Sequence, residues 1–453
     1  EADPHSEDIA PSLDAPIGVE DCASVEILMK MFPLTFDEDG SWLIRKQDLA
    51  FISFGCALLG SGGGGATHGS FVRGCHALEQ GKKIRVVPVS SLPEDSLVVP
   101  VAFLGAPSVL NEKIASGKEF QFMENLEHTD LRRISEAASG GKFSLQGTIR
   151  AVMSAEIGGM NGMEPLLVSA ETGFPVVDAD GMGRAFPQLD HFLPYVYGVP
   201  GLPCTIANHQ GDSVMVTKAA SSRILEDILR VNSINFGCVG GLTMCPLSME
   251  TIRAHCVQNS VSLAWRLGAA MHVVRHSPSL DPMRALPAMV QGQILYSGKI
   301  CSLERRVEKG FSVGRILVGP IQPVVSGQQS HDSPSEEPLM RVTFRNENIL
   351  VERVCCPEQM NTPVEELTAL EQCACVPNII SVLETESGFP IACEELSFGQ
   401  RVSLLVQPGP LQYHTEQAMK IIGPRAFGLH CEYQPTCSTG SYVQGPSVFD
   451  DTA

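Results

Sequence analysis

The stretch Val176-Val-Asp-Ala-Asp-Gly-Met-Gly-Arg-Ala-Phe-Pro187 joins an apolar run to two acids, two glycines and one arginine. Asp178 and Asp180 follow the apolar residues directly, and Arg184 comes after the glycines. An apolar strand that ends in acids and glycines is typical of the carboxyl end of a sheet, where open α/β folds keep their binding crevices. Because ionised side chains rarely lie beside a core without a partner or a task, we expect the functional site here.

The pattern of apolar residues changes once along the chain, near residue 290. Before it, short apolar runs alternate with helix-like segments, including one predicted helix over 248–274, and this favours an α/β domain with a mixed or parallel sheet. After it, short strands separated by Gly, Pro and Asn predict a smaller all-β domain, with a last strand over 419–422. We therefore expect an acidic leader or linker at 1–40, an α/β domain at 41–290, an all-β domain at 291–432 with loop insertions near 326–338 and 355–376, and a tail at 433–453.

The chain is acidic, with 51 Asp or Glu against 32 Lys or Arg and a formal net charge of -19. Residues 1–40 hold eleven acids and one base, Lys30, a local balance of -10. An acidic surface without a basic stripe argues against a nucleic-acid partner. No apolar run approaches the roughly 20 residues that span a bilayer, and no secretory leader is evident, so we expect a cytoplasmic protein with no membrane partner. The first residue is Glu1, which predicts a trimmed chain or a piece of a longer one.

The 15 cysteines raise the question of disulfides or zinc. In a chain of this length without a secretory signal, we expect most of them to be reduced and buried. The two close groups, Cys355-Cys356 and Cys373-Ala-Cys375, lack the paired CxxC spacing of a zinc site. Zinc is therefore the weaker interpretation.

A run of four glycines, Gly62 to Gly65, follows the first expected helix. Successive backbone N–H groups in such a run can form an anion nest, so Gly63, Gly64 and Gly65 are candidates to bind substrate. The spacing matches neither GxGxxG nor a P-loop, and a flexible turn is the alternative. His68, three residues further on, is a candidate general base or metal ligand, or a surface residue.

The segment Glu156-Ile-Gly-Gly-Met-Asn161 repeats the pattern of an acid, glycines and an amide after an apolar run. Glu156, Asp178 and Asp180 would then lie at neighbouring strand ends. Such a cluster either binds a divalent cation or raises one pKa to make a general base. Asn161 binds substrate or caps a helix, and Arg184 binds substrate or neutralises Asp178.

His209 is the last catalytic candidate, in the polar loop Asn208-His-Gln-Gly-Asp212. Asp212 would orient its ring. A surface loop is the alternative, and the sequence does not decide between them.

Five motifs, in this order along the chain, resemble the S-methyl thiohydantoin desulfurase family: Gly60-Ser-Gly-Gly-Gly-Gly65, Glu156-Ile-Gly-Gly-Met-Asn161, Pro175-Val-Val-Asp-Ala-Asp-Gly-Met-Gly-Arg-Ala-Phe-Pro187, Phe344-Arg-Asn-Glu-Asn348 and Gly423-Pro-Arg-Ala-Phe-Gly428. The likeness runs from about residue 45 to residue 430. The resemblance implies an α/β domain followed by a smaller β-domain, and association with hydantoinase- or oxoprolinase-like proteins as a partner or a fused part. Family members usually have Asp-Pro after the glycines, whereas this chain has Ala66-Thr67.

The resemblance and the residues together predict a hydrolase that acts on a cyclic amide or thioamide of the hydantoin or S-methyl thiohydantoin type. Asp178 or Asp180 would be the base or a metal ligand, and Glu156 the supporting acid. Arg184 and the glycine amides would hold ring oxygens, and Asn161 would fix the ring. The alternatives are a non-catalytic or auxiliary domain that partners a hydantoinase- or oxoprolinase-like protein, and a lyase or isomerase of a secondary pathway. The sequence leaves the substrate, any metal and a homo-oligomeric state open.

Overall fold

The structure is a computed structural model of the 453-residue chain. It describes residues 24–106, 109, 112–113, 115–121, 130–321, 339–355, 364–435 and 446–450. The leader up to residue 23, the predicted insertion at 326–338 and most of the predicted tail lie outside the described residues. None of the helices within these ranges is long and apolar enough to cross a membrane.

Within the described residues, eleven strands form one mixed sheet in the order β1-β2-β3-β6-β5-β4-β9-β7-β8, with β10 paired to β4 and β11 to β6. Its centre, β3-β6-β5-β4, is parallel and its outer pairs are antiparallel. Every residue of β4 except the last is buried, which explains why the central strands read as continuous apolar runs. The strands are β1 (Thr35–Phe36), β2 (Trp42–Leu43), β3 (Arg85–Val87), β4 (Ser96–Gly105), β5 (Thr148–Ser154), β6 (Val176–Asp180), β7 (Cys204–Ala207), β8 (Ser213–Val216), β9 (Val239–Thr243), β10 (Leu247–Ser248) and β11 (Val257–Gln258).

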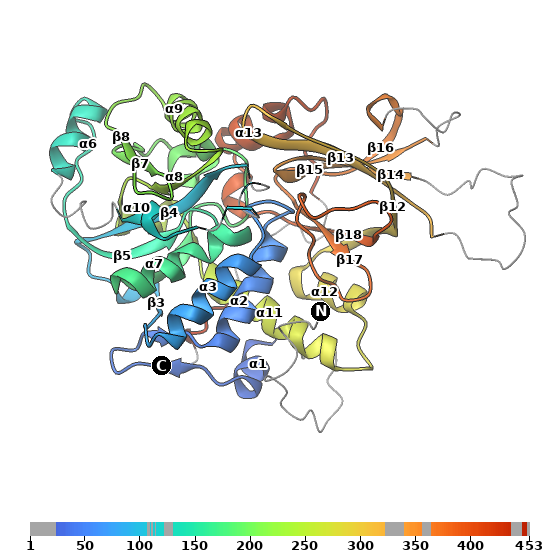
Figure 1. The fold of residues 1–453 in the computed structure, drawn as a ribbon, viewed down its shortest axis with the longest axis horizontal. Helices are drawn as coiled ribbons and strands as arrows, with labels where there is room; N and C mark the ends of the chain where they lie inside the picture. Colours follow the sequence, from blue (N-terminus) through green and yellow to red (C-terminus); the bar gives the residue numbers. More distant parts are fainter. Residues whose placement is uncertain are drawn as a thin grey trace, which may run out of the picture.

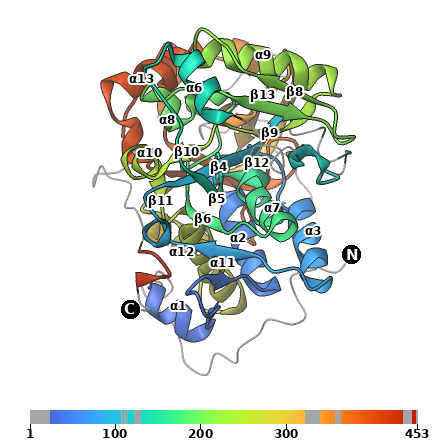
Figure 2. The ribbon, with the colours of Figure 1, turned by 90° about the vertical axis from the view of Figure 1, so that its left-hand side faces the viewer.

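Helices cover both faces of this sheet, as Figure 2 shows. One apolar core joins it to α2, α7 and α11, and a second joins its other face to α8, α9, α10 and α13. Neighbouring residues of one strand, such as Val98 and Val99, enter opposite cores, as the alternation of a strand requires. The helices are α1 (Val25–Met31), α2 (Lys46–Leu59), α3 (His68–Glu79), α6 (Leu131–Ser139), α7 (Glu164–Thr172), α8 (Leu193–Val196), α9 (Ser222–Asn235), α10 (Met249–His255), α11 (Ser260–His276), α12 (Pro282–Val290) and α13 (Glu416–Ile422).

The second sheet lies beside the first and is antiparallel throughout (Figure 1). In the part of the chain that the structure describes, its seven strands run in the order β16-β15-β14-β13-β12-β18-β17. The prediction of an α/β domain followed by a smaller all-β domain is thus confirmed as a fold class. The strands are β12 (Gln293–Glu308), β13 (Phe311–Gly319), β14 (Leu339–Arg345), β15 (Glu347–Val354), β16 (Ala369–Cys375), β17 (Ile379–Glu384) and β18 (Arg401–Gln407).

Three local predictions differ from the structure. The single helix expected over 248–274 is two helices, α10 and α11, because β11 between them pairs with β6. The strand expected over 419–422 is the end of helix α13, which Thr415 caps by accepting from the Ala418 N–H. Part of the loop expected over 355–376 is β16, an edge strand whose first three residues are exposed and therefore look like a polar loop.

Helices α2 and α11 cross at two glycines, and this crossing positions the glycine run that follows α2. A Cβ atom on Gly55 would lie 2.0 Å from the Ala264 carbonyl oxygen, and one on Gly268 would lie 2.0 Å from the Phe51 carbonyl oxygen. Only glycine permits this backbone approach. The carboxyl end of α2 is also tied to the second sheet, since the Ser381 hydroxyl donates to the Leu58 carbonyl over 2.9 Å.

Candidate active site

The glycine run passes between the two sheets and is held on both sides. Gly62, Gly64 and Gly65 have φ of +81°, +72° and +83°, a region that favours glycine. On one side, the Met160 N–H donates to the Gly65 carbonyl over 2.9 Å. On the other side, the Asn348 N–H donates to the carbonyl of Ser61 over 2.7 Å. The run is therefore an ordered junction between the two halves of the chain, and its glycines permit close packing.

Glu156 follows β5, and two fixed donors orient its carboxyl group. The Asn161 amide donates to Glu156 Oε1 over 2.7 Å, and the Phe186 N–H donates to Oε2 over 2.8 Å. Asn161 is held in turn by both backbone groups of Phe103 on β4, over 2.7 and 3.2 Å. Asn161 therefore positions Glu156, a role that the sequence pattern did not separate from substrate binding.

Glu347 reaches the same place from the second sheet, at the tip of the β14–β15 hairpin. Asn346 turns the chain with φ of +59°, a conformation that Asn tolerates better than most residues. The Glu347 side chain then packs on the glycine run, where a Cβ atom on Gly63 would lie 2.2 Å from Glu347 Oε1. Oε2 is buried and has no hydrogen-bond partner among the described residues. One oxygen of this carboxyl group is thus left for a ligand or a water.

Arg184 supplies a fully buried positive charge beside these two acids. Its Nη1 donates to the carbonyls of Pro377 and Asn378, over 3.2 and 2.5 Å, and its Nε donates to Ala185 O over 2.9 Å. The guanidinium carbon lies 4.3 Å from the centre of the Phe186 ring. In the described part of the chain Nη2 has no acceptor. Arg184 is therefore held by backbone carbonyls, and its charge acts on the acids through space.

Burial and neighbouring negative charges raise the pKa of both acids. Burial raises the pKa of Glu156 to about 7, and the nearby Asp180 adds to this rise. Burial raises the pKa of Glu347 well above its usual range, with the charge of Glu156 as the next cause. Arg184 opposes both shifts, and burial lowers its own pKa to about 10. Near neutral pH Glu347 is therefore protonated, whereas Glu156 has a pKa close to that pH and can ionise.

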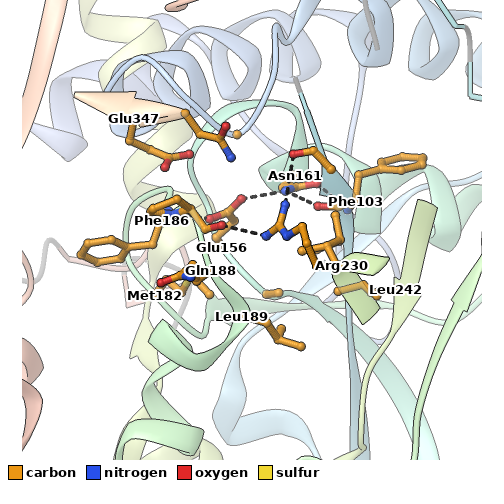
Figure 3. Close-up of a pocket in the computed structure, with 17 residues that line it drawn as sticks. Phe103, Glu156, Asn161, Met182, Phe186, Gln188, Leu189, Arg230, Leu242 and Glu347 are labelled. Atoms are coloured by element: carbon orange, nitrogen blue, oxygen red, sulfur yellow. Dashed lines mark hydrogen bonds between the residues drawn. The ribbon is translucent and has the colours of Figure 1, made fainter. Parts of the chain in front are cut away.

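Glu156, Asn161 and Glu347 line a small cavity of about 50 Å³ (Figure 3). Glu156 and Glu347 enter it from different sheets, with Arg230 on α9 at another wall. Arg230 is already paired with Glu226 over 2.7 Å. The lining comprises Gly64, Ala102, Phe103, Leu104, Gly105, Ala155, Glu156, Asn161, Met182, Phe186, Pro187, Gln188, Leu189, Arg230, Leu242, Asn346 and Glu347. Most of this wall is apolar, and both acids are buried and desolvated.

The structure places Asp178 and Asp180 next to this cavity but outside its lining. Asp178 accepts from the Val261 and Ser262 N–H groups over 2.9 and 3.0 Å, at the amino end of α11. Asp180 Oδ2 accepts from Ile157, Met182 and Gly183 N–H groups, so it fixes the loops that carry Glu156 and Arg184. These contacts fit positioning roles, and a direct catalytic role for either aspartate stays a prediction from sequence.

The two histidine candidates lie elsewhere. His68 is exposed at the start of α3 and lines a separate pocket of about 300 Å³ on the other side of the glycine run, together with Gly63 and Gly65. His209 is exposed, and Asp212 accepts from the Asn208 amide over 2.9 Å. Among the described side chains, no three His, Cys, Asp or Glu residues are arranged to hold a metal ion. Metal binding therefore rests on the sequence pattern alone.

Comparison with models of known protein families assigns the chain to a family. Residues 47–218 match the model of the S-Me-THD-like N-terminal domain, and residues 220–436 match that of the S-Me-THD-like C-terminal domain. The chain belongs to the S-methyl thiohydantoin desulfurase-like family. This confirms the resemblance seen in the motifs. The two matches meet before α9, so β9, β10 and β11 of the mixed sheet lie in the second one.

A solved structure of a protein from Chromobacterium violaceum shares the fold. It is 22% identical in sequence with a TM-score of 0.64, and the match covers 87% of this chain and 99% of that one. No curated protein matches the chain.

Glu347 lines the cavity but is not among the candidate residues predicted from the sequence. It lies in Phe344-Arg-Asn-Glu-Asn348, one of the five motifs that resemble the family. A signal was present, because an acid after Asn346 in a predicted hairpin turn lies at the end of two strands. Its packing against Gly63 connects residues that are far apart in the sequence, and no local pattern predicts that contact.

We expect Asp178→Asn to lower stability more than catalysis. Asn carries no charge at the amino end of α11. With its oxygen facing the two N–H donors, its NH2 group takes the place of Oδ2, which accepts from the Ser262 hydroxyl, and the change costs about 1–3 kcal/mol. Turnover per folded molecule should fall less than about tenfold, since Asp178 lies outside the cavity lining. Chemical denaturation and kcat on the same sample separate the two effects. A large loss of kcat in a fully folded variant would instead support a direct catalytic role for Asp178.

We also expect the protein to be most stable at mildly acidic pH. Burial raises the pKa of Glu156 to about 7 and of Asp180 to about 6, so the folded state binds more protons than the unfolded state between about pH 4 and 7. Folding is therefore favoured as the pH falls from about 8 to about 5. Exposed acids with lowered pKa, such as Glu94, act in the opposite direction, and their contribution is lost as the pH falls further. Urea midpoints across this range would test the sign, and a steady rise from pH 5 to 8 would contradict it.

Proposed function

We propose that the chain is a hydrolase of five-membered cyclic amides or thioamides of the hydantoin or S-methyl thiohydantoin type. Family membership supports thiohydantoin-related chemistry. The observation that carries the proposal is the pair of buried carboxyl groups, Glu156 and Glu347, around one small, mostly apolar cavity. A carboxyl group that stays protonated beside one that ionises near neutral pH supplies both an acid and a base.

The pair is suited to replacing sulfur by oxygen on a ring carbon. Glu156 takes a proton from water while the water oxygen adds to the carbon that bears the methylthio group, and Glu347 gives its proton to the ring nitrogen. In the second half, Glu156 returns its proton to the departing sulfur, and Glu347 takes the proton of the new hydroxyl as the carbonyl forms. The products are the hydantoin and methanethiol, and both acids regain their starting states.

The surrounding residues have supporting tasks in this proposal. Asn161 and the Phe186 N–H fix the orientation of the Glu156 carboxyl group. Arg184 keeps the charge of the pair balanced without occupying the cavity. Gln188, which also lines the cavity, is the polar side chain to hold a ring oxygen. The small cavity favours a substrate whose reacting ring enters alone.

Turnover of a small panel of compounds tests the proposal. The panel contains S-methyl thiohydantoins, thiohydantoins and hydantoins, with thiol release and ring opening measured separately. Release of methanethiol from the S-methyl compounds by the purified chain is expected. Turnover of hydantoins alone would keep the hydrolase class but move the reaction to ring opening. A folded protein that acts on none of them would overturn the proposal.

One observation favours the alternative of a non-catalytic or auxiliary domain. Ala66 and Thr67 line the pocket of His68, at the positions where the family usually has Asp-Pro, and neither Asp178 nor Asp180 lines that pocket. If the family reaction depends on that aspartate, the wild-type chain should be inactive and Ala66→Asp should gain thiol release. If the wild-type chain is active and Ala66→Asp does not raise its activity, the alternative of a non-catalytic domain is excluded.

A further inference from the structure

Two thiols outside the candidate site meet where the carboxyl-terminal segment crosses the end of β16. Cys375 is the last residue of β16 and is buried, and Cys431 is half-buried after the turn at Pro424–Phe427. Both pack into the apolar core that also contains α8 and α13. Each is a free thiol.

Hydrogen bonds on both sides fix this crossing. The Gln372 amide donates to the Glu432 carbonyl over 2.9 Å, and the Cys375 thiol lies 3.8 Å from the same oxygen. Further along, the Asn378 amide donates to the Gln434 carbonyl over 3.2 Å, and the Tyr433 hydroxyl donates to Asn378 Oδ1 over 3.2 Å. Residues 432–434 are thereby held in register along the end of β16, with Cys431 beside Cys375.

The two thiols act on each other. Burial raises the pKa of Cys375 to about 12, and the charge of Cys431 is the next cause. Burial also raises the pKa of Cys431, while a hydrogen bond to Cys375 opposes that rise. The Glu432 carbonyl oxygen, which lies 3.8 Å from the Cys375 sulfur, belongs to the residue directly after Cys431. The chain therefore brings the two thiols side by side, as formation of a disulfide requires.

We propose that Cys375 and Cys431 form a modification site at which a disulfide oxidant, such as oxidised glutathione, closes a cystine bridge. The Cys431 thiolate is the more exposed of the two and attacks one sulfur of the oxidant, releasing one glutathione thiol. Cys375 then attacks the Cys431 sulfur of the mixed disulfide and releases the second glutathione. Two protein thiols are oxidised, one glutathione disulfide is reduced, and the two protons leave on the two glutathione thiols.

The bridge would reinforce a strand end that matters for the site. The residues directly after Cys375 include Pro377 and Asn378, whose carbonyls hold Arg184. A cystine closed in a geometry already present constrains chiefly the unfolded chain. Oxidation should therefore raise the thermal midpoint and leave the cavity open.

Disulfide mapping of the full chain tests the proposal. The reduced protein is incubated with oxidised glutathione at about pH 8, where more thiolate is present, and is then digested with trypsin and a Glu-specific protease. The expected result is a fragment that links Cys375 to Cys431. Cys373→Ser, on the same strand, is the matched control and should keep that fragment.

The single variants make the outcome decisive. Cys375→Ser should accumulate a glutathione adduct on Cys431, and Cys431→Ser should lose both the linked fragment and the rise in thermal midpoint. A bridge from Cys431 to a different cysteine would overturn the proposal. So would a wild-type chain in which the adduct on Cys431 persists without resolving.

Discussion

Glu156→Gln should abolish turnover while leaving the chain folded. The variant retains the shape of the side chain but cannot take a proton from water, and general-base catalysis is typically worth about 10²–10⁴-fold in rate. The Gln NH2 group opposes the Phe186 N–H, so we expect a loss of stability of no more than about 1–3 kcal/mol. Measuring kcat and the urea midpoint on one preparation tests both statements.

The pH dependence of kcat distinguishes a catalytic role of Glu156 from a purely structural one. Glu156 must be ionised to act as a base, so kcat should rise with pH through about 7. Glu347 must be protonated, and its raised pKa places the falling limb at higher pH. Glu164→Gln is the matched control, because Glu164 is also buried with a raised pKa but is paired with Arg73 and Ser70 outside the cavity. Equal losses of kcat in both variants would argue that the effect is structural.

The sequence located the site region because its signal is local. The apolar run before Asp178, the glycines after Asp180 and the parallel motif at Glu156 all mark strand ends, and neighbouring parallel strands β5 and β6 bring those ends together. The same reasoning predicted the two-part fold, since the change from helical to strand-like periodicity is also local. Arg184 follows these glycines in the sequence, and its charge acts on Glu156 and Glu347 in the structure, while its role in binding substrate stays a prediction.

The sequence could not predict which of the acids faces the cavity and which one positions a loop or a helix. Asp178 and Glu156 look alike as acids after apolar strands, and what separates them is the set of donors that each one meets. Asp178 meets two N–H groups of α11, about eighty positions later in the chain. Glu156 meets one amide and one N–H, and its remaining surface faces a cavity. Glu347 comes from a different sheet altogether, so its role follows from tertiary packing.

Arg184→Met should be the most destabilising substitution at the site. It removes the buried positive charge that lowers the pKa of both acids and leaves the carbonyls of Pro377 and Asn378 without their donor. Removing one member of a buried charged group typically costs about 3–5 kcal/mol. Arg425→Met is the matched control, since Arg425 is exposed and its partner Glu432 is exposed as well. Urea unfolding of the two variants should therefore differ by several kcal/mol.

The same substitution also predicts a direction for the pH profile. Arg184 lowers the pKa of both acids, so its loss should move the rising limb of kcat to higher pH. Arg184→Lys separates charge from geometry, because lysine retains the positive charge but lacks the planar fork that reaches three carbonyls. In the Arg184→Lys protein, the rising limb of kcat should stay nearer its original pH, but the free energy of unfolding should still fall. An unchanged limb in a folded Arg184→Met protein would mean that the charge of Arg184 does not act on the two acids, and that burial and the nearby Asp180 set the pKa of Glu156.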